Sequence, residues 1–162
     1  MVKLGDELQI LKKYIDIQNN RFNGKITLHL DIHDELYNIR ILRMILQPVV
    51  ENSVVHGLSA LKENGRIEIT GRETGGDIYI YVTDNGKGIE SDRLNEINAQ
   101  LDKEIDYGQL EYRERIGIFN VNARIKLLFG NMYGLRLFPG PDGGNRTRII
   151  LPISTDVREN ND

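Results

Sequence analysis

Apolar residues recur along this chain with two different periods, and each period predicts a different kind of element. Helical spacing near the N-terminus predicts a helix over roughly residues 5–22, with apolar positions at Leu4, Leu8, Leu11, Ile15 and Phe22. Asp6 and Glu7 lie in the first turn of this helix. Acids are favourable there because the helix dipole is positive at its N-terminus.

Alternation of apolar and polar residues predicts strands. It is found in the segments KITLHLDI (25–32), GRIEITGRE (65–73), DIYIYVTD (77–84), YGLRLFPG (133–140) and RTRIILPI (146–153). The turn ETGGD joins the second strand to the third, so these two form a hairpin.

Three further segments are helical: RMILQPVVENSVVHGL (43–58), IESDRLNEINAQL (89–101) and IGIFNVNARIKLLFG (116–130). Pro48 is expected in the first turn of its helix, because in mid-helix it would cost about 3 kcal/mol. Gly57 is expected at the end of the same helix. The charged segment 102–115 lacks an apolar period and is expected to be a mobile surface loop.

The order of elements is helix, strand, helix, strand, strand, helix, helix, strand, strand. This order does not alternate strictly between strand and helix. It predicts an α/β protein of the α+β two-layer sandwich type, in which helices cover one face of a mixed, mostly antiparallel sheet.

Composition narrows the functional classes. The 162 residues, 40% of them hydrophobic, suffice for one domain. A net charge of −3 lacks the basic excess of a nucleic-acid-binding protein. Cysteine is absent, which excludes disulfides, thiolate metal sites and a cysteine nucleophile, and fits a reducing compartment. No apolar run is long enough to span a membrane, so we expect no direct membrane contact by this chain.

The stretch TDNGKGIES (83–91) is either a connecting loop or a ligand loop. Asn-Gly suggests a hairpin turn, but a helix follows, so no second strand is available to pair. The motif of the P-loop is missing, and Ser91 stands where a dinucleotide fingerprint has its third glycine. As a ligand loop, it would use Asp84 to accept a hydrogen bond from the exocyclic amine of adenine. Gly86 and Gly88 would let the backbone approach a flat ring.

The stretch ENSVVHG places Asn52 and His56 four residues apart, on one helix face. One interpretation is ordinary capping of a helix end. The other is a site for a hard cation, in which the amide oxygen of Asn52 binds Mg²⁺ that also holds phosphates. Glu51 stands beside Asn52. His29 and His33 have no partners at metal-ligand spacing and are interpreted as structural.

The stretch GIFN opens the helix at 116–130 and contributes Gly117 and Asn120. A helix N-terminus offers free N–H groups and a positive dipole to phosphates. Glycine near a helix start is common, so this feature alone is a weak signal.

Together these stretches resemble the ATP-binding domain of sensor histidine kinases in the GHKL superfamily. LQPVVENSVVHG is similar to the N box of that family, DNGKGI to its G1 box and IGIFNVNARIKLLFG to its G2 box. The preceding LGDELQILKKYIDIQNNRF resembles the LytS and YesM types in particular. The resemblance runs from about residue 4 to residue 152.

The resemblance implies a role for each site residue. Asn52 would hold Mg²⁺, Glu51 would order metal-bound water, and His56 would lie near the phosphates. The adenine pocket and the phosphate contacts would be formed by Asp84, Gly86, Gly88, Gly117 and Asn120. The implied fold is the Bergerat sandwich. We expect a linker helix (1–23), an ATP-binding catalytic domain (24–152) with a lid at about 100–115, and a disordered tail (153–162).

Two positions depart from the family pattern, since Arg115 replaces the first glycine of the G2 box and Asn145 replaces a threonine before the last strand. His33, in IHDELYN, lies within the ATP domain and is rejected as the phosphoacceptor. The resemblance therefore implies transfer of the ATP γ-phosphate to a histidine on a dimerisation segment absent from this chain.

A response regulator would then receive the phosphate, and the chain would be the cytoplasmic part of a membrane-bound sensor. The alternatives are a regulatory domain that binds nucleotide without kinase turnover and an interaction module without a ligand.

Overall fold

The computed structural model describes residues 1–21, 26–60, 64–104 and 117–153. The predicted lid, with Arg115, lies outside the described residues except for residues 100–104, and so does the predicted tail except for residue 153. The described ranges hold a five-stranded sheet, a separate two-stranded pair and the helices that cover the larger sheet.

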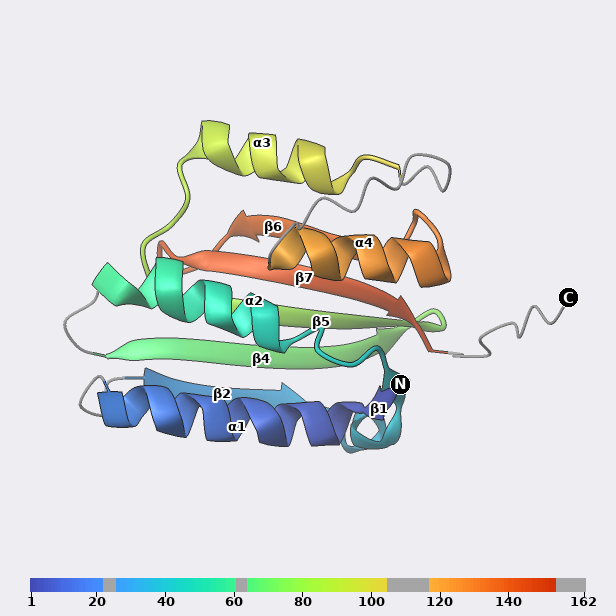
Figure 1. Ribbon diagram of the computed structural model, residues 1–162, viewed down its shortest axis with the longest axis horizontal. Helices are drawn as coiled ribbons and strands as arrows, with labels where there is room; N and C mark the ends of the chain where they lie inside the picture. The colour runs from blue at the N-terminus through green and yellow to red at the C-terminus, as the bar shows by residue number, and fades with distance from the viewer. Residues whose placement is uncertain (22–25, 61–63, 105–116, 154–162) are drawn as a thin grey trace, which may run out of the picture.

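One five-stranded sheet organises the chain, with the strand order β2-β4-β5-β7-β6 (Figure 1). Its strands are β2 (Ile26–Ile32), β4 (Gly65–Thr74), β5 (Asp77–Asp84), β6 (Gly134–Pro139) and β7 (Asn145–Pro152). Strand β2 pairs with β4 in parallel, and the other three pairs are antiparallel. The predicted mixed, mostly antiparallel sheet is confirmed.

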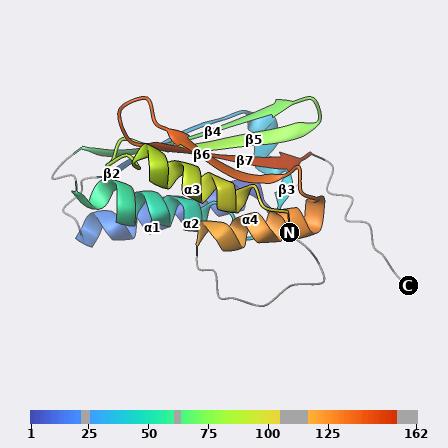
Figure 2. The ribbon, with the colours of Figure 1, turned by 90° about the horizontal axis from the view of Figure 1, so that it is seen from above.

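The helices form a second layer on one face of the sheet (Figure 2). They are α1 (Leu4–Arg21), α2 (Gln47–Asn52), α3 (Ser91–Leu101) and α4 (Ile118–Phe129). Alternation along β5 explains the arrangement, because Ile78, Ile80 and Val82 are buried while Tyr79 and Tyr81 on the other face are half-buried. The helical face of the sheet is therefore the core, and the two-layer prediction is confirmed.

Helix α1 belongs to the same core as the sheet. Four of its apolar residues are almost completely buried, namely Leu4, Leu8, Leu11 and Ile15. They join one continuous cluster with Val50 of α2 and Ile67 of β4. The helix therefore packs against the domain that comes after it in the chain.

The structure adds elements to those that periodicity predicts. Two short strands, β1 (Val2–Lys3) and β3 (Arg40–Ile41), pair antiparallel, and residues Asp34–Asn38 form a 3₁₀ helix. The helix predicted over 43–58 begins later, with Pro48 in its first turn as expected. It then widens into a π-helix at Ser53–Gly57 and ends in a 3₁₀ turn at Leu58–Ala60. Short π segments inside helices often occur at functional sites.

Candidate functional site

Three segments distant in sequence meet around the carboxylate of Asp84. Asp84 is the last residue of β5, and only 3% of it is exposed. Its Oδ1 accepts hydrogen bonds from the backbone N–H groups of Gly86 (3.0 Å) and Asn145 (3.4 Å). A buried carboxylate held by two backbone donors has a fixed position, as a ligand anchor requires.

Burial raises the pKa of Asp84 above its ordinary value, because the charged form loses its hydration. Hydrogen bonds from the Gly86 backbone, the Ser53 side chain and Asn145 act in the opposite direction and stabilise the carboxylate. The net effect is a raised pKa, so burying the charged form of Asp84 destabilises the fold. Such a perturbed acid is a candidate functional group.

Glycines allow the segments around Asp84 to approach this closely. A Cβ on Gly86 would lie 2.3 Å from the carbonyl group of Gly57, and one on Gly144 would lie 2.1 Å from the carbonyl oxygen of Asp84. A Cβ on Gly88 would lie 2.4 Å from the carbonyl oxygen of Gly143. Gly86 and Gly88 thus let protein segments pack on one another. Their predicted contact with a flat ring stays a prediction.

Two asparagines hold the loop that comes directly after Asp84. The side chain of Asn145 donates to the carbonyl of Lys87 (3.1 Å) and accepts the N–H of Ile89 (3.1 Å). Asn85 accepts the N–H of Arg66 (2.7 Å) and donates to the carbonyl of Asn64 (2.9 Å). The departure from the family pattern at Asn145 is therefore a structural tie across the loop.

The widened helix presents two neighbouring faces to the site. Ser53 and Gly57, four residues apart, are buried and face Asp84: the Ser53 side chain bonds to its carboxylate, and a Cβ on Gly57 would lie 2.8 Å from its Oδ1. Asn52 and His56, also four residues apart, each precede one of these residues. Consecutive residues on a helix lie roughly a quarter of a turn apart, so Asn52 and His56 lie next to the face that contacts Asp84. The sequence therefore puts an amide and an imidazole beside the buried acid.

Glu51, Asn52 and His56 form what we call the polar helix face. His56 is exposed, whereas Glu51 and Asn52 are half-buried. Glu51 accepts a hydrogen bond from Gln47 Nε2 (2.8 Å). Among the described residues we find no hydrogen-bond partner for the side chains of Asn52 and His56. Within the described part of the chain, no side chain or backbone group therefore occupies the amide oxygen of Asn52, which leaves it available to a ligand.

Gly117 is the N-cap of helix α4, and its φ of 84° lies in the left-handed region that favours glycine. No side chain caps this helix, and nothing lies within 4 Å of a Cβ built on Gly117. The Asn120 side chain is exposed at the same end. These are the conditions under which a helix start leaves N–H groups for an anion.

The two cations further along α4 are engaged elsewhere. The guanidinium of Arg124 donates to the carbonyl of Arg43 (2.7 Å), and Lys126 Nζ donates to the carbonyl of Leu101 (2.6 Å). They tie α4 to other elements. They are therefore not free cations at the N-terminal end of the helix.

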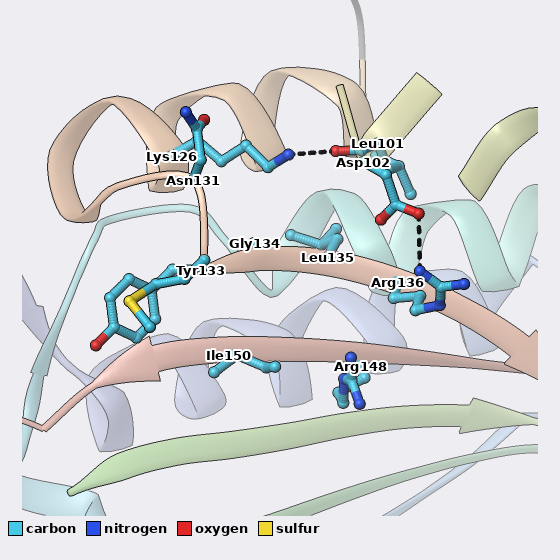
Figure 3. A pocket seen from close by; sticks show the side chains of 11 residues that line it. Leu101, Asp102, Lys126, Asn131, Tyr133, Gly134, Leu135, Arg136, Arg148 and Ile150 are labelled. Atoms are coloured by element: carbon cyan, nitrogen blue, oxygen red, sulfur yellow. Dashed lines mark hydrogen bonds and ion pairs between the residues drawn. The ribbon is translucent and has the colours of Figure 1, made fainter. Parts of the chain in front are cut away.

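A cavity of about 110 Å³ lies near the C-terminal end of α4 (Figure 3). It is lined by Lys126, Asp102, Arg136 and Arg148, among others. Asp102 pairs with Arg136 (2.8 Å), and Lys126 points at Leu101. The part of β7 that lines this cavity lies three to five residues beyond Asn145, or roughly 10–16 Å along the strand. The cavity is thus separate from the site around Asp84.

The structure places the predicted Asp84 and Gly86 in one cluster, with Asn52 and His56 on the adjoining helix face, and it adds further residues to the cluster. We use the name Asp84 cluster for Ser53, Gly57, Asp84, Gly86, Gly144 and Asn145. Ser53, Gly57, Gly144 and Asn145 were not predicted as site residues. Ser53 and Gly144 carry no distinctive local signal, because each acts through a contact with a segment far away in the chain.

Residues 37–155 match the family described as histidine kinase-, DNA gyrase B- and HSP90-like ATPases. Over 157 residues the chain is 30% identical to the sensor histidine kinase YesM of Bacillus subtilis (strain 168), covering 97% of this chain and 25% of YesM. It is 34% identical over 142 residues to the sensor histidine kinase YpdA of Escherichia coli (strain K12), covering 87% of this chain and 23% of YpdA. The chain thus spans about a quarter of the length of these relatives.

The fold is similar to that of histidine kinase ThkA in its crystal structure with the response regulator protein TrrA. The TM-score is 0.63 at 14% identity, over 94% of this chain and 41% of ThkA. At this identity the likeness concerns the fold. It agrees with the two-layer architecture that the strand and helix pattern predicts.

Proposed function

The chain belongs to the family of histidine kinase-, DNA gyrase B- and HSP90-like ATPases, and from this premise we propose that it binds ATP with Mg²⁺ and serves as a histidine kinase catalytic domain. In this proposal the γ-phosphate passes to a histidine on a dimerisation segment of the full-length kinase. The single observation that carries the nucleotide site is the Asp84 cluster, a buried acid fixed by backbone donors beside an open polar face.

Adenine fits the Asp84 cluster by its hydrogen bonding. An ionised carboxylate has two oxygens with about four acceptor positions, of which the two backbone donors to Oδ1 and the Ser53 side chain use three. Acceptor capacity therefore remains for the exocyclic amine of adenine, whereas guanine has a carbonyl at the equivalent position. Gly86 and Gly88 shape the pocket indirectly, because they let the neighbouring segments close around the acid.

Magnesium fits the polar helix face by its donor set. Mg²⁺ prefers oxygen ligands and usually binds through one or two protein groups together with substrate phosphates and water. The Asn52 amide oxygen would be such a ligand, and Glu51 beside it would order the water. The described ranges contain no group of three His, Cys, Asp or Glu side chains that could hold a metal, so the nucleotide's phosphates would complete this site. Bound Mg²⁺ would neutralise phosphate charge.

The residues of this chain then act mainly by positioning. His56, Gly117 and Asn120 would lie near the phosphates, with the uncapped start of α4 supplying N–H groups. Phosphoryl transfer depends on alignment and charge stabilisation more than on covalent chemistry by the protein. The acceptor histidine is external in this proposal, and the exposed His33 is assigned no role in transfer.

We further propose a response regulator as the partner that receives the phosphate, in line with the crystallised complex of ThkA with TrrA. No described helix is long and apolar enough to cross a membrane. The proposal that this domain is the cytoplasmic part of a membrane-bound sensor rests on the resemblance to sensor kinases. Asn145 departs from the family pattern, but it does not support a purely regulatory nucleotide-binding role, because its side chain ties the loop after Asp84.

The test is a titration of the wild type and Asp84→Asn with Mg-ADP, followed by thermal unfolding. The wild type should gain about 2.7 kcal/mol of stability at a hundredfold excess of ligand over Kd. Loss of a charged hydrogen bond to adenine should weaken the mutant's binding roughly tenfold to a hundredfold. Asp92→Asn, at an exposed acid on α3, is the matched control. Equal affinity of Asp84→Asn and wild type would refute the adenine assignment.

Kinase activity needs a second measurement, since nucleotide binding alone does not separate the alternatives. The chain is incubated with ATP, Mg²⁺ and an added dimerisation segment that carries the acceptor histidine. Phosphorylation of that segment is expected. Tight Mg-ADP binding without any transfer would instead support the regulatory role.

A further inference from the structure

A buried acid on α1 contacts the start of the helix that carries the proposed magnesium ligand. Glu7 is 2% exposed, although it lies in the first turn of α1. Its neighbour Asp6 is exposed. Glu7 occurs within the apolar stripe of α1, one position before the buried Leu8, and its side chain points into the protein. An acid in such a place requires a partner that compensates for lost hydration.

The partner of Glu7 is the N-terminus of α2. Its Oε1 accepts the N–H of Leu46 (3.0 Å). Burial raises the pKa of Glu7, and the backbone N–H groups of Leu46, Ile45 and Gln47 act in the opposite direction. Leu46 is the N-cap of α2, and no side chain from α2 itself caps this end. The first N–H groups of a helix have no partner within the helix, and its dipole is positive there. Glu7 therefore acts as a cap supplied by another helix.

A second element holds the same segment. Arg124 of α4 donates to the carbonyl oxygens of Arg43 (2.7 Å) and Met44 (3.5 Å), and its charge stabilises the Glu7 carboxylate. Residues 43–47 are thus fastened to α1 on one side and to α4 on the other. Within the described ranges, Glu7 Oε2 is buried without a hydrogen-bond partner. The capping contact is therefore one-sided and rests on Oε1.

Helix α2 depends on such external contacts for its orientation. Its α-helical part has six residues, far fewer than a helix needs to be stable alone. Asn52 lies six residues beyond Leu46, or about 9 Å along the axis, so a small tilt at the capped end displaces its side chain. Gln47 adds a direct route, because its N–H faces Glu7 and its side chain donates to Glu51 at 2.8 Å.

We propose that Glu7 is a positioning residue for the magnesium site: by capping α2 from α1 it sets where Asn52 and Glu51 face the nucleotide's phosphates. This inference rests on the proposed function. Outer groups that orient a metal ligand change metal affinity by about 10- to 100-fold when they are lost. Glu7 acts on the metal only through α2 and leaves the adenine contact at Asp84 unchanged.

The experiment measures the Kd for ADP with Mg²⁺, for ADP in EDTA and for adenosine, in the wild type and in Glu7→Gln, Glu7→Leu and Asp6→Asn. The magnesium increment is the ratio of the Kd for ADP in EDTA to the Kd with Mg²⁺. Glu7→Leu fills the buried space without an acceptor and should reduce the increment about tenfold. Glu7→Gln keeps one acceptor oxygen and should reduce it less. Asp6→Asn should leave it unchanged, and adenosine should bind all four proteins alike.

The outcomes separate this inference from the proposed function. A wild type without a magnesium increment would overturn the proposed metal site and the role of Glu7 with it. A wild type with an increment that both Glu7 variants retain would overturn the role of Glu7 alone. Parallel loss of adenosine and Mg-ADP affinity would show a general effect on folding, which also contradicts a positioning role. Should Glu7→Leu fail to fold, Glu7→Gln decides the result.

Discussion

The Asp84 cluster and the polar helix face adjoin each other, because Ser53 and Gly57 of the widened helix belong to the cluster, yet the two regions are built in opposite ways. Asp84 is 3% exposed, accepts two backbone hydrogen bonds and lies among glycines that tolerate no Cβ. Asn52 and His56 are half-buried and exposed, without partners among the described residues. One region is fixed by contacts within the protein, whereas Asn52 and His56 in the other have no side-chain hydrogen-bond partner in the described part of the chain.

The contrast arises from the kind of ligand that each region would bind. A flat base is recognised by shape and by a few fixed hydrogen bonds, which a close-packed pocket can provide in advance. Phosphates with Mg²⁺ need oxygen ligands and donors that stay accessible. The glycines differ in the same way: Gly86 is required because of its neighbours, whereas Gly117 is required because of its backbone angle.

The largest effect is expected from Gly86→Ala. Its Cβ would lie 2.3 Å from the Gly57 carbonyl, and backbone cannot move aside cheaply. We expect about 3 kcal/mol of destabilisation in urea unfolding, with loss of nucleotide binding. Gly76→Ala in the β4–β5 turn is the control for backbone strain alone: nothing lies within 4 Å of its Cβ, but its φ of 86° opposes a side chain, so it should lose about 1 kcal/mol. Equal stability of the two variants would mean that the Asp84 cluster is not close-packed.

A smaller effect is expected from Asn52→Ala, on the polar helix face. Removing the proposed Mg²⁺ ligand should weaken Mg-ADP binding about tenfold, or about 1.4 kcal/mol, while adenosine binding stays the same. Calorimetry with each ligand measures both quantities. Val55→Ala, at an exposed neighbour on the same helix, is the control. If Asn52→Ala instead reduced adenosine binding, the division of labour between the two regions would be wrong.

Gly117→Ala should cost less, about 1 kcal/mol, because only the left-handed φ of 84° opposes the new methyl group. Gly75→Ala shares this type of strain, with a φ of 64° and open space, in a turn outside the site. Both variants should lose similar stability in thermal unfolding. Only Gly117→Ala should also weaken Mg-ADP binding. If both variants bind Mg-ADP with equal affinity, Gly117 does not lie near the phosphates.

The smallest effect concerns pH. The pKa of Asp84 is raised above its ordinary value of 3.8, so the folded protein keeps a proton that the unfolded chain has released. The stability contributed by Asp84 therefore falls as pH rises from 3.8 to the raised pKa and is constant above it. Asp84→Asn removes this dependence. Urea unfolding across this range should show wild type losing stability relative to the mutant as pH rises.

Asp31 provides the contrast with opposite sign. The hydrogen bond from Arg72 lowers the pKa of Asp31 in the folded protein. The stability that Asp31 contributes is therefore present above pH 3.8 and is lost as pH falls through this lowered pKa. Asp31→Asn should therefore remove a small stabilisation at neutral pH that wild type loses in acid. Identical slopes for the variants at Asp84 and Asp31 would show that burial does not perturb Asp84.

Much of the fold could be predicted from local pattern. Alternation identified the five strands of the sheet, and glycines such as Gly130 marked helix ends. The short pair β1–β3 was missed because two-residue strands carry no periodic signal. The start of α2 was also missed. The N-terminal end of α2 is capped by Glu7 from another helix, and a cap of this kind has no local signature in the sequence.

The candidate site was predictable where function needs a residue type at one position. Asp84, Asn52 and Gly117 could be named because an acid after a buried strand, an amide in an apolar helix and a glycine at a helix start are locally unusual. Ser53, Gly144 and Glu7 could not be assigned in this way. Their roles are contacts with segments far away in the chain.

The sequence by itself determined the order and type of the main elements and the residues that carry the proposed chemistry, because periodicity and residue type are local properties. Only the tertiary structure decided that Gly86 and Gly144 serve close packing around an acid, and that Asn145 ties the loop. It also decided that Glu7, an ordinary first-turn acid in the sequence, caps a different helix. Burial and partner identity depend on which segments meet, and a local pattern does not contain that information.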